Sequence, residues 1–209
     1  MLDQLRIAVL VSGSGSNLQA LLDAQLSGLL HSGRITLVIS DNPVAYALER
    51  AKAAGVQTLA LDRRAMGVAQ VEKHILQALK QEHIDLIVLA GFLMILSADF
   101  VGHFEGRIIN VHPSLLPAFG GKGYYGIKVH QAALARGVKL SGATVHLVNA
   151  EPDGGPILMQ KAVRVLKNDT AETLQQRIMR QAEWRILPRA TQMLCKQLLK
   201  EAHHAVHTP

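Results

Sequence analysis

Two hydrophobic patterns alternate along the chain up to residue 136. Short, uninterrupted apolar runs are typical of buried strands, whereas apolar residues at every third or fourth position are typical of amphipathic helices. The runs predict strands at 7–11, 35–40, 56–61, 84–90 and 107–111, and the periodic segments predict helices at 16–30, 44–54, 68–83, 97–103 and 127–136. This alternation predicts an α/β fold with a Rossmann-like N-terminal half, in which a mostly parallel, twisted sheet carries helices on both faces.

The pattern changes after residue 136. Apolar segments at 143–148 and 157–165 predict two strands, and the short turn region between them predicts that they pair antiparallel. A long helix is expected from about residue 170 to 202, with Asp169 or Thr170 as its cap and with a bend or break at Pro188. No linker, repeat or low-complexity tract interrupts the sequence, so residues 1–209 are expected to form one domain.

The composition narrows the choice of partners. The chain has 209 residues, 49% of them hydrophobic, which predicts a globular protein. Only 4% are aromatic, which argues against binding of single-stranded nucleic acid by base stacking. The net charge of +6 would suit nucleic acid or small acidic molecules, and the scattered positive residues favour small acidic substrates.

Several features favour a cytoplasmic location. The single cysteine, Cys195, cannot form an internal disulfide, and its ordinary interpretation is an inert thiol. The first six residues lead into a predicted strand and do not resemble a signal peptide, and the longest apolar run, 86–96, is too short to cross a bilayer. The histidine-containing tail, 203–209, is expected to be a frayed end without a metal role.

A glycine-rich turn, SGSGSNL at residues 12–18, joins the first predicted strand to the first predicted helix. Glycines let the backbone approach an anion, and the free N–H groups of a helix N-terminus favour phosphate. The alternative is a plain structural turn capped by Ser16. The turn lacks the third glycine of a dinucleotide fingerprint, because Leu18 stands there, and it lacks the lysine of a Walker loop.

The fifth predicted strand ends in Asn110 and His112, which should share one face because they are two residues apart. An amide and a protonated imidazole can stabilise an oxyanion, and the later carboxylate of Asp153 could raise the pKa of the imidazole and orient it. These residues favour chemistry at a carbonyl carbon. By base rate, Asp153 shapes a turn and His146, in the middle of a strand, is a packed core residue.

The loop after the fourth strand, Leu93 to Leu96, is apolar and lies at the edge of the sheet where ligands bind in open α/β folds. The loop either belongs to the hydrophobic core or binds a flat ring through hydrogen bonds from its backbone groups. No cluster of residues has convincing metal-site spacing. Four histidines are expected on helix surfaces: His74, His83, His103 and His130.

With these motifs placed, the chain resembles the phosphoribosylglycinamide formyltransferase family over about residues 6–200. The resemblance rests on SGSGSNLQA at 12–20, LAGF at 89–92, NVHPSLLP at 110–117 and DGGP at 153–156. It implies the formyltransferase fold and the following roles: Asn110, His112 and Asp153 in catalysis; Gly15, Ser16 and Asn17 at the substrate phosphate; Leu93, Met94, Ile95, Leu96 and Asn110 at the folate; His146 and Glu183 in supporting positions. Two family arginines that serve the glutamate tail of folate are missing, with Met94 and Val68 at or near their places.

The resemblance implies transfer of a formyl group from the cosubstrate 10-formyltetrahydrofolate to the amine of 5-phosphoribosylglycinamide, in purine (IMP) biosynthesis, with no metal. The expected partners are these small molecules, without nucleic acid or membrane, and the protein is expected to be a monomer or a homodimer. The alternatives are another enzyme of the superfamily, such as a formyltetrahydrofolate hydrolase, and a nucleotide-binding module without catalytic activity.

Overall fold

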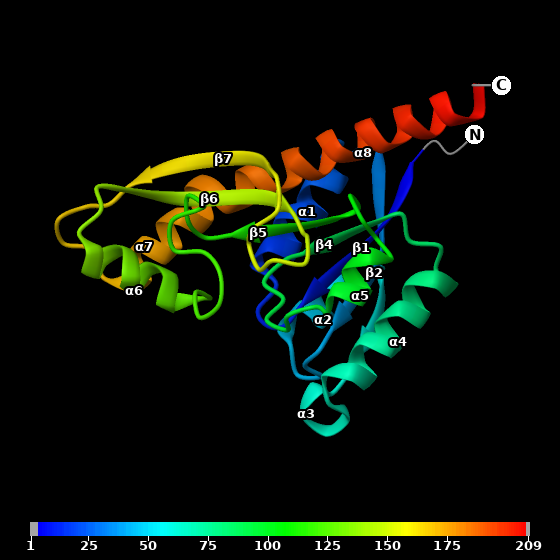
Figure 1. The fold of residues 1–209 in the computed structure, drawn as a ribbon, viewed down its shortest axis with the longest axis horizontal. Coiled ribbons are helices and arrows are strands. Elements are labelled where there is room, and N and C mark those ends of the chain that lie inside the picture. Colours follow the sequence, from blue (N-terminus) through cyan, green and yellow to red (C-terminus); the bar gives the residue numbers. More distant parts are fainter. Residues whose placement is uncertain (1–3, 208–209) are drawn as a thin grey trace.

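A seven-stranded sheet runs through the molecule, and a computed structural model describes its residues 4–207 (Figure 1). Across the sheet, the strand order is β3-β2-β1-β4-β5-β6-β7. The strands are β1 (Leu5–Val11), β2 (Gly33–Ser40), β3 (Gln57–Ala60), β4 (Leu86–Leu89), β5 (Ile108–His112), β6 (Leu140–Leu147) and β7 (Ile157–Arg164).

The strand pairing confirms the predicted mixed sheet. Strands β1 to β5 pair parallel with one another, whereas β6 pairs antiparallel with β5 and with β7. In the centre, Leu10 of β1 pairs with Leu89 of β4, which in turn pairs with Asn110 of β5. The carboxyl ends of β1, β4 and β5 therefore lie side by side, as the predicted ligand-binding edge requires.

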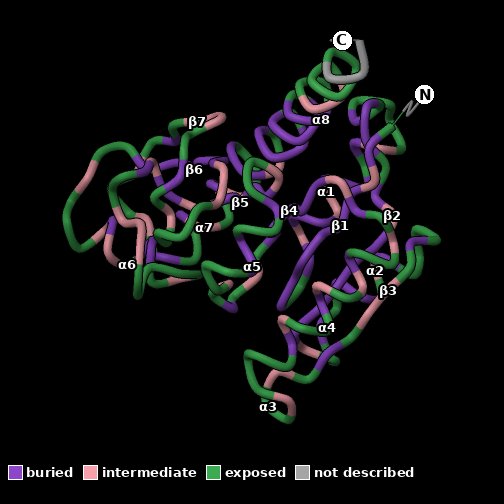
Figure 2. The backbone as a smooth tube through the Cα atoms, turned by 45° about the vertical axis from the view of Figure 1, so that its right-hand side comes forward, coloured by how far each residue is buried: buried purple, intermediate pink, exposed green. Residues whose placement is uncertain are grey.

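Helices cover both faces of the sheet (Figure 1). The two faces carry separate hydrophobic clusters, because alternate residues of a strand point to opposite faces: Ile7 and Val9 join one cluster, and Ala8 and Leu10 join the other. The helices are α1 (Ser16–Leu26), α2 (Tyr46–Ala53), α3 (Arg63–Met66), α4 (Val68–Gln81), α5 (Ala98–Gly102), α6 (Ile127–Arg136), α7 (Ala171–Ile178), the π-helical turn η1 (Met179–Glu183) and α8 (Trp184–His207). Figure 2 shows buried residues concentrated along the central strands.

The C-terminal helix differs from its prediction. It is divided by the π-helical turn η1 and then continues through Pro188, so of the bend or break predicted at the proline, the break is wrong. The π turn shifts the hydrogen-bond ladder just before the place where the proline removes a donor. Thr170 caps α7 as predicted, in a capping box with Thr173. Helix α8 extends to His207, and residues 208–209 of the predicted frayed tail lie outside the described residues.

The short helix α3 is absent from the predicted elements. Four residues are too few to show a hydrophobic period, and the helix depends instead on Asp62, whose carboxylate accepts hydrogen bonds from the N–H groups of Arg64 and Ala65. Within the described residues, no helix is long and apolar enough to cross a membrane.

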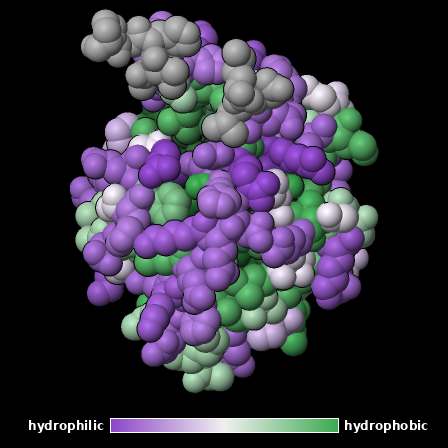
Figure 3. Space-filling model, turned by 90° about the vertical axis from the view of Figure 1, so that its right-hand side faces the viewer, coloured by the Kyte–Doolittle hydropathy of each residue, from purple (hydrophilic) through white to green (hydrophobic). Residues whose placement is uncertain are grey.

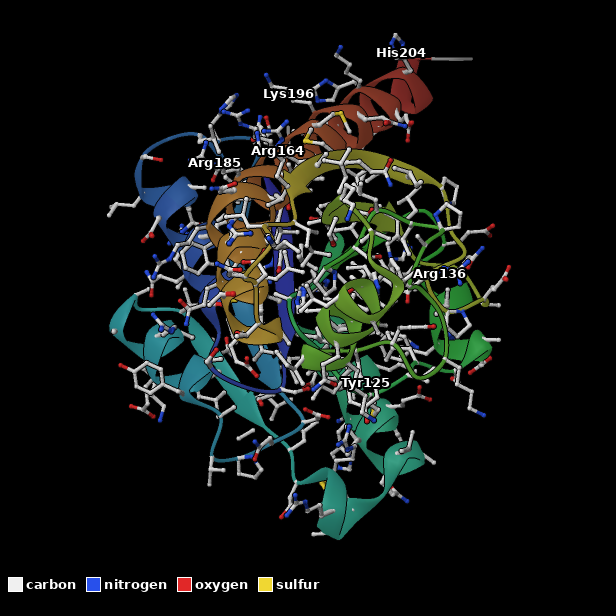
Figure 4. All side chains as sticks on the ribbon, turned by 90° about the vertical axis from the view of Figure 1, so that its left-hand side faces the viewer. Tyr125, Arg136, Arg164, Arg185, Lys196 and His204 are labelled. Carbon is white, nitrogen blue, oxygen red and sulfur yellow. The ribbon has the colours of Figure 1, made fainter. Side chains whose placement is uncertain are left out.

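Polar side chains dominate the face of the molecule shown in Figure 3, where hydrophobic areas are separated from one another. The positive charges are spread over several elements, as the sequence predicts. Figure 4 places four of them on α6, β7 and α8: Arg136, Arg164, Arg185 and Lys196.

Gly142 of β6 lies against the backbone of β7, and we predict that Gly142→Ala lowers the free energy of unfolding by about 1–3 kcal/mol. A Cβ atom at this position would lie 2.1 Å from the carbonyl oxygen of Lys161 and 2.8 Å from Cδ2 of Leu115, so the two strands would have to separate. Urea denaturation measures the change. Gly102→Ala in α5, where a Cβ meets nothing within 4 Å, is the matched control. Equal stability of the two variants would contradict the prediction.

Candidate active site

Two loops meet at the carboxyl edge of the sheet and are tied to each other. The N–H group of Ser12, at the end of β1, donates to the carbonyl oxygen of Gly91 at 3.1 Å. The hydroxyl of Ser12 accepts a hydrogen bond from the N–H group of Leu93 at 2.9 Å. The glycine-rich loop and the loop after β4 thus form one connected rim beside the end of β5.

Four polar side chains converge next to this rim. The carboxylate of Asp153 lies 3.3 Å from Nδ1 of His112 and 3.4 Å from Nε2 of His146. The amide of Asn110 donates to Asp153 at 3.4 Å and lies 3.2 Å from Nε2 of His146. Asn110 and His146 face each other across the antiparallel pair of β5 and β6. Asn110 and His112 therefore share one face of β5, as their spacing predicts, and His146 belongs to the same cluster.

The hydrogen bonds fix where protons lie in this cluster. Nε2 of His112 lies 2.8 Å from the carbonyl oxygen of Phe119, and Nδ1 of His146 lies 2.9 Å from that of Leu147. A carbonyl only accepts, so each of these nitrogens carries the proton. Nδ1 of His112 can then donate to Asp153 only when the imidazole is charged, and a neutral ring would turn a lone pair towards the carboxylate.

Burial and charge act against each other at His112. Burial lowers the pKa of His112, while the Asp153 carboxylate and the Phe119 carbonyl raise it, and the net pKa lies below the ordinary value. Asp153 raises the pKa of His112, as predicted. The net pKa of His112 is nevertheless lowered, because the residue is almost fully buried and burial has the larger effect. For Asp153, burial raises the pKa, but the bonds from His146 and Gly121 and the charge of His112 prevail and hold it below the ordinary value.

Two backbone groups of the loop after β5 complete the cluster. Besides the Phe119 carbonyl on His112, the N–H group of Gly121 donates to Oδ2 of Asp153 at 2.9 Å. Phe119 has a φ of +54°, which is uncommon for a residue with a side chain. The sequence gives no signal for the Phe119 contact. The glycines at 120 and 121 are the only indication that the backbone turns tightly here.

The base of the same loop is held by a buried hydroxyl. The Thr144 hydroxyl donates to the carbonyl oxygen of Ser114 at 2.7 Å and accepts from the N–H group of Leu116 at 3.0 Å. The amide of Gln160 donates to the same hydroxyl at 3.0 Å and to the Leu116 carbonyl oxygen at 2.9 Å. Strands β6 and β7 thereby fix the chain that leaves β5 after His112.

The glycine-rich loop presents a helix N-terminus without a side-chain cap. Gly15 is the N-cap of α1, in a left-handed conformation with a φ of 73°, and no side chain bonds to the first turn. The alternative of a turn capped by Ser16 is therefore not found. The uncapped N–H groups of the first turn suit an anion.

Glu183 lies beneath this loop. Its carboxylate accepts a hydrogen bond from the Asn17 amide at 2.7 Å, and burial raises its pKa to about 7, against the lowering effect of that bond. The Asn17 side chain is thus held by Glu183 and is almost fully buried, and the backbone N–H group of Asn17 belongs to the uncapped first turn. Glu183 belongs to η1, and π-helical turns recur at functional sites.

The loop after β4 alternates between solvent and core. Leu93 and Ile95 are exposed by 54% and 63%, whereas Met94 is buried in the hydrophobic cluster with Phe100. The Met94 side chain therefore cannot reach a ligand at the rim, and only its backbone is available. Leu96 packs at the margin of the same cluster.

The prediction that His130 lies on a helix surface is wrong. The residue is fully buried in α6, and neither ring nitrogen has a hydrogen-bond partner. Burial, and then the charge of His112, lower its pKa to about 4. The buried neighbours Val129 and Ala133 lie one and three residues away on the same helix, and this spacing could have revealed the buried face. His74, His83 and His103 are exposed as predicted, although His83 follows the end of α4. Among the described residues, no group of three or more His, Cys, Asp or Glu side chains is arranged to hold a metal ion.

Comparisons with known proteins identify the family. Residues 5–191 match the formyl transferase family. The trifunctional purine biosynthetic protein adenosine-3 of Drosophila melanogaster is 43% identical over 90% of the chain, which spans 14% of that protein. The crystal structure of glycinamide ribonucleotide transformylase 1 from Symbiobacterium toebii superposes with a TM-score of 0.87 at 42% identity, covering 94% of this chain and 90% of that one. A formyltetrahydrofolate deformylase from Pseudomonas syringae pv. tomato superposes with a TM-score of 0.81 at 28% identity, covering 93% of this chain and 62% of that one.

We predict that His130 makes the protein sensitive to acid. Its pKa in the folded protein, about 4, lies below the ordinary value of 6.5, so the unfolded chain binds more protons between these values. The free energy of unfolding should therefore fall as the pH drops through this window, by at most about 3 kcal/mol from this residue. Urea denaturation from pH 7 to pH 4.5 should show a shallower loss for His130→Phe than for the wild type. Parallel curves would contradict the prediction, and His74→Gln controls for the loss of an exposed histidine.

Proposed function

The chain belongs to the formyl transferase family, and we propose that it transfers a formyl group from 10-formyltetrahydrofolate to the amine of 5-phosphoribosylglycinamide in purine biosynthesis. The observation that carries the proposal is the convergence of Asn110, His112 and Asp153 beside an uncapped, glycine-rich helix N-terminus. The cluster of Asn110, His112 and Asp153 suits acyl transfer, and the helix N-terminus suits a phosphorylated acceptor. The similarity to a glycinamide ribonucleotide transformylase over 94% of the chain supports the same assignment.

The reaction begins with a neutral amine. An α-amino group with a pKa of about 8 is partly neutral near pH 7 and can attack the formyl carbon. The attack gives a tetrahedral intermediate with a negative oxygen, towards which the Asn110 amide and the protonated ring of His112 donate. One such donor is typically worth about 3 kcal/mol.

Collapse of the intermediate completes the transfer. The C–N bond to the folate breaks, and His112 passes a proton to the leaving nitrogen. Asp153 stabilises the charged imidazole and accepts, through water, the proton that the attacking amine loses. Nε2 of His112 is bonded to the Phe119 carbonyl, so this loop has to release the ring before that nitrogen can serve the reaction.

The two ligands occupy neighbouring parts of the rim. The substrate phosphate binds the N–H groups of Gly15, Ser16 and Asn17, while the folate ring binds backbone groups of the loop from Leu93 to Leu96, next to Asn110. His146 and Glu183 support the two parts, by contacts to Asp153 and to Asn17. A cytoplasmic location and a monomeric or dimeric state remain predictions.

A second candidate is hydrolysis of the formyl folate, which the structural similarity to a deformylase supports. The same cluster would then direct water, in place of the amine, at the formyl carbon. The uncapped glycine-rich loop favours the transferase, because hydrolysis involves no phosphorylated acceptor.

An assay of folate product release separates the two candidates. We expect tetrahydrofolate to form only when 5-phosphoribosylglycinamide is added to enzyme and 10-formyltetrahydrofolate, with absorbance as the readout. His112→Ala serves as the inactive reference and should lower kcat at least about 100-fold, since it removes the proton donor. Equal product release without the acceptor would identify a hydrolase and reject the transferase.

We predict that Asp153→Asn shifts the activity towards acid. The change is nearly isosteric, and asparagine tolerates the positive φ of 56° at this position. It removes the charge that raises the pKa of His112, so less imidazolium remains at neutral pH and the surviving activity moves to lower pH. The pH profile of kcat/KM and an NMR titration of His112 measure both effects. A folded variant with an unshifted titration would remove Asp153 from the catalytic set.

A further inference from the structure

Helix α2 holds two successive carbonyl groups of the glycine-rich loop. The N–H group of Ala47 donates to the carbonyl oxygen of Gly13 at 3.1 Å. One turn further along the helix, Nε of Arg50 donates to the carbonyl oxygen of Ser14 at 2.9 Å. Both carbonyl groups therefore point towards α2.

Because the peptide group is planar, the directions of these carbonyl groups fix the directions of the N–H groups that follow them. In a trans peptide, the C=O of one residue and the N–H of the next point in opposite directions. The N–H groups of Ser14 and Gly15 consequently point away from α2. Together with the first turn of α1, they form a concave set of donors of the kind that binds phosphate.

Arg50 is itself fixed on the far side of the loop. Its Nη1 donates to the side-chain oxygen of Gln19 at 3.0 Å, and its guanidinium carbon lies 5.0 Å from the centroid of the Tyr46 ring. The loop has no room to shift towards α2, because a Cβ atom on Gly15 would lie 2.6 Å from Cβ of Ala47. The guanidinium therefore lies on the side of the loop opposite the N–H donors.

We propose that Arg50 is a positioning residue for the substrate phosphate: by holding the Ser14 carbonyl, it turns the Gly15 N–H group towards the anion without touching the anion. The proposal rests on the proposed function for the identity of the substrate, but the binding of a sugar phosphate tests it without any turnover. Arginine suits this role because its fork holds Ser14 and Gln19 together, whereas a lysine ammonium is a single point.

The test compares Arg50→Met, Arg50→Lys and the wild type. Methionine keeps an unbranched stem against the loop and loses the donors. Arg34→Met is the matched control, because it removes one exposed arginine from β2 at the start of the strand, away from the rim. Calorimetry with ribose 5-phosphate gives the Kd, and steady-state kinetics give kcat and the two KM values.

We expect Arg50→Met to raise the Kd for ribose 5-phosphate and the KM for 5-phosphoribosylglycinamide about tenfold, which corresponds to about 1.4 kcal/mol. Arg50→Lys should weaken both to a smaller extent. The kcat, the KM for the formyl folate and the midpoint of thermal unfolding should stay within about twofold, or about 2 °C, of the wild type. Arg34→Met should bind like the wild type.

Three results would overturn the proposal. The first is unchanged binding of ribose 5-phosphate by Arg50→Met. The second is full affinity in Arg50→Lys, which would point to a simple charge effect. The third is a parallel loss of formyl-folate binding and thermal stability, which would reveal a purely structural residue. If the wild type binds ribose 5-phosphate and makes no formylated product, the proposed function fails while the binding comparison still decides the role of Arg50.

Discussion

The carboxylate of Asp153 is the contact on which the rest of the site depends. It lies on the turn between β6 and β7, yet it reaches both histidines and the Asn110 amide, and it accepts the N–H group of Gly121. A largely buried carboxylate is costly unless it is paired and hydrogen-bonded. Its partners come from three separate segments of the chain, so the ionised form of Asp153 requires that all three are correctly placed.

The parallel and antiparallel parts of the sheet supply different parts of the site. The parallel half brings the ends of β1, β4 and β5 to one edge, where backbone N–H groups are available to ligands. The antiparallel half adds His146 opposite Asn110 and carries Asp153 back to the end of β5.

Much of this arrangement could be predicted from the sequence. Strand ends and the two-residue spacing of Asn110 and His112 are encoded by local pattern, and the mostly parallel sheet follows from the alternation of strands and helices. The contacts of Phe119 and Gly121 could not be predicted, because they are made by the backbone and depend on the path of a loop. The net direction of the pKa shift of His112 could not be predicted for a related reason. The sequence indicates a charged partner, Asp153, whereas the depth of burial is known only from the packed fold.

The bond between His112 and the Phe119 carbonyl bears on unwanted hydrolysis of a formyl donor. Formyl folates carry an activated one-carbon group, and water at high concentration competes with any amine for it. The proton of Nε2 is bonded to the Phe119 carbonyl, and His112 is only 4% exposed. A formyl donor would therefore meet a cluster whose hydrogen bonds are directed inwards until the loop that carries Phe119 moves away from the ring.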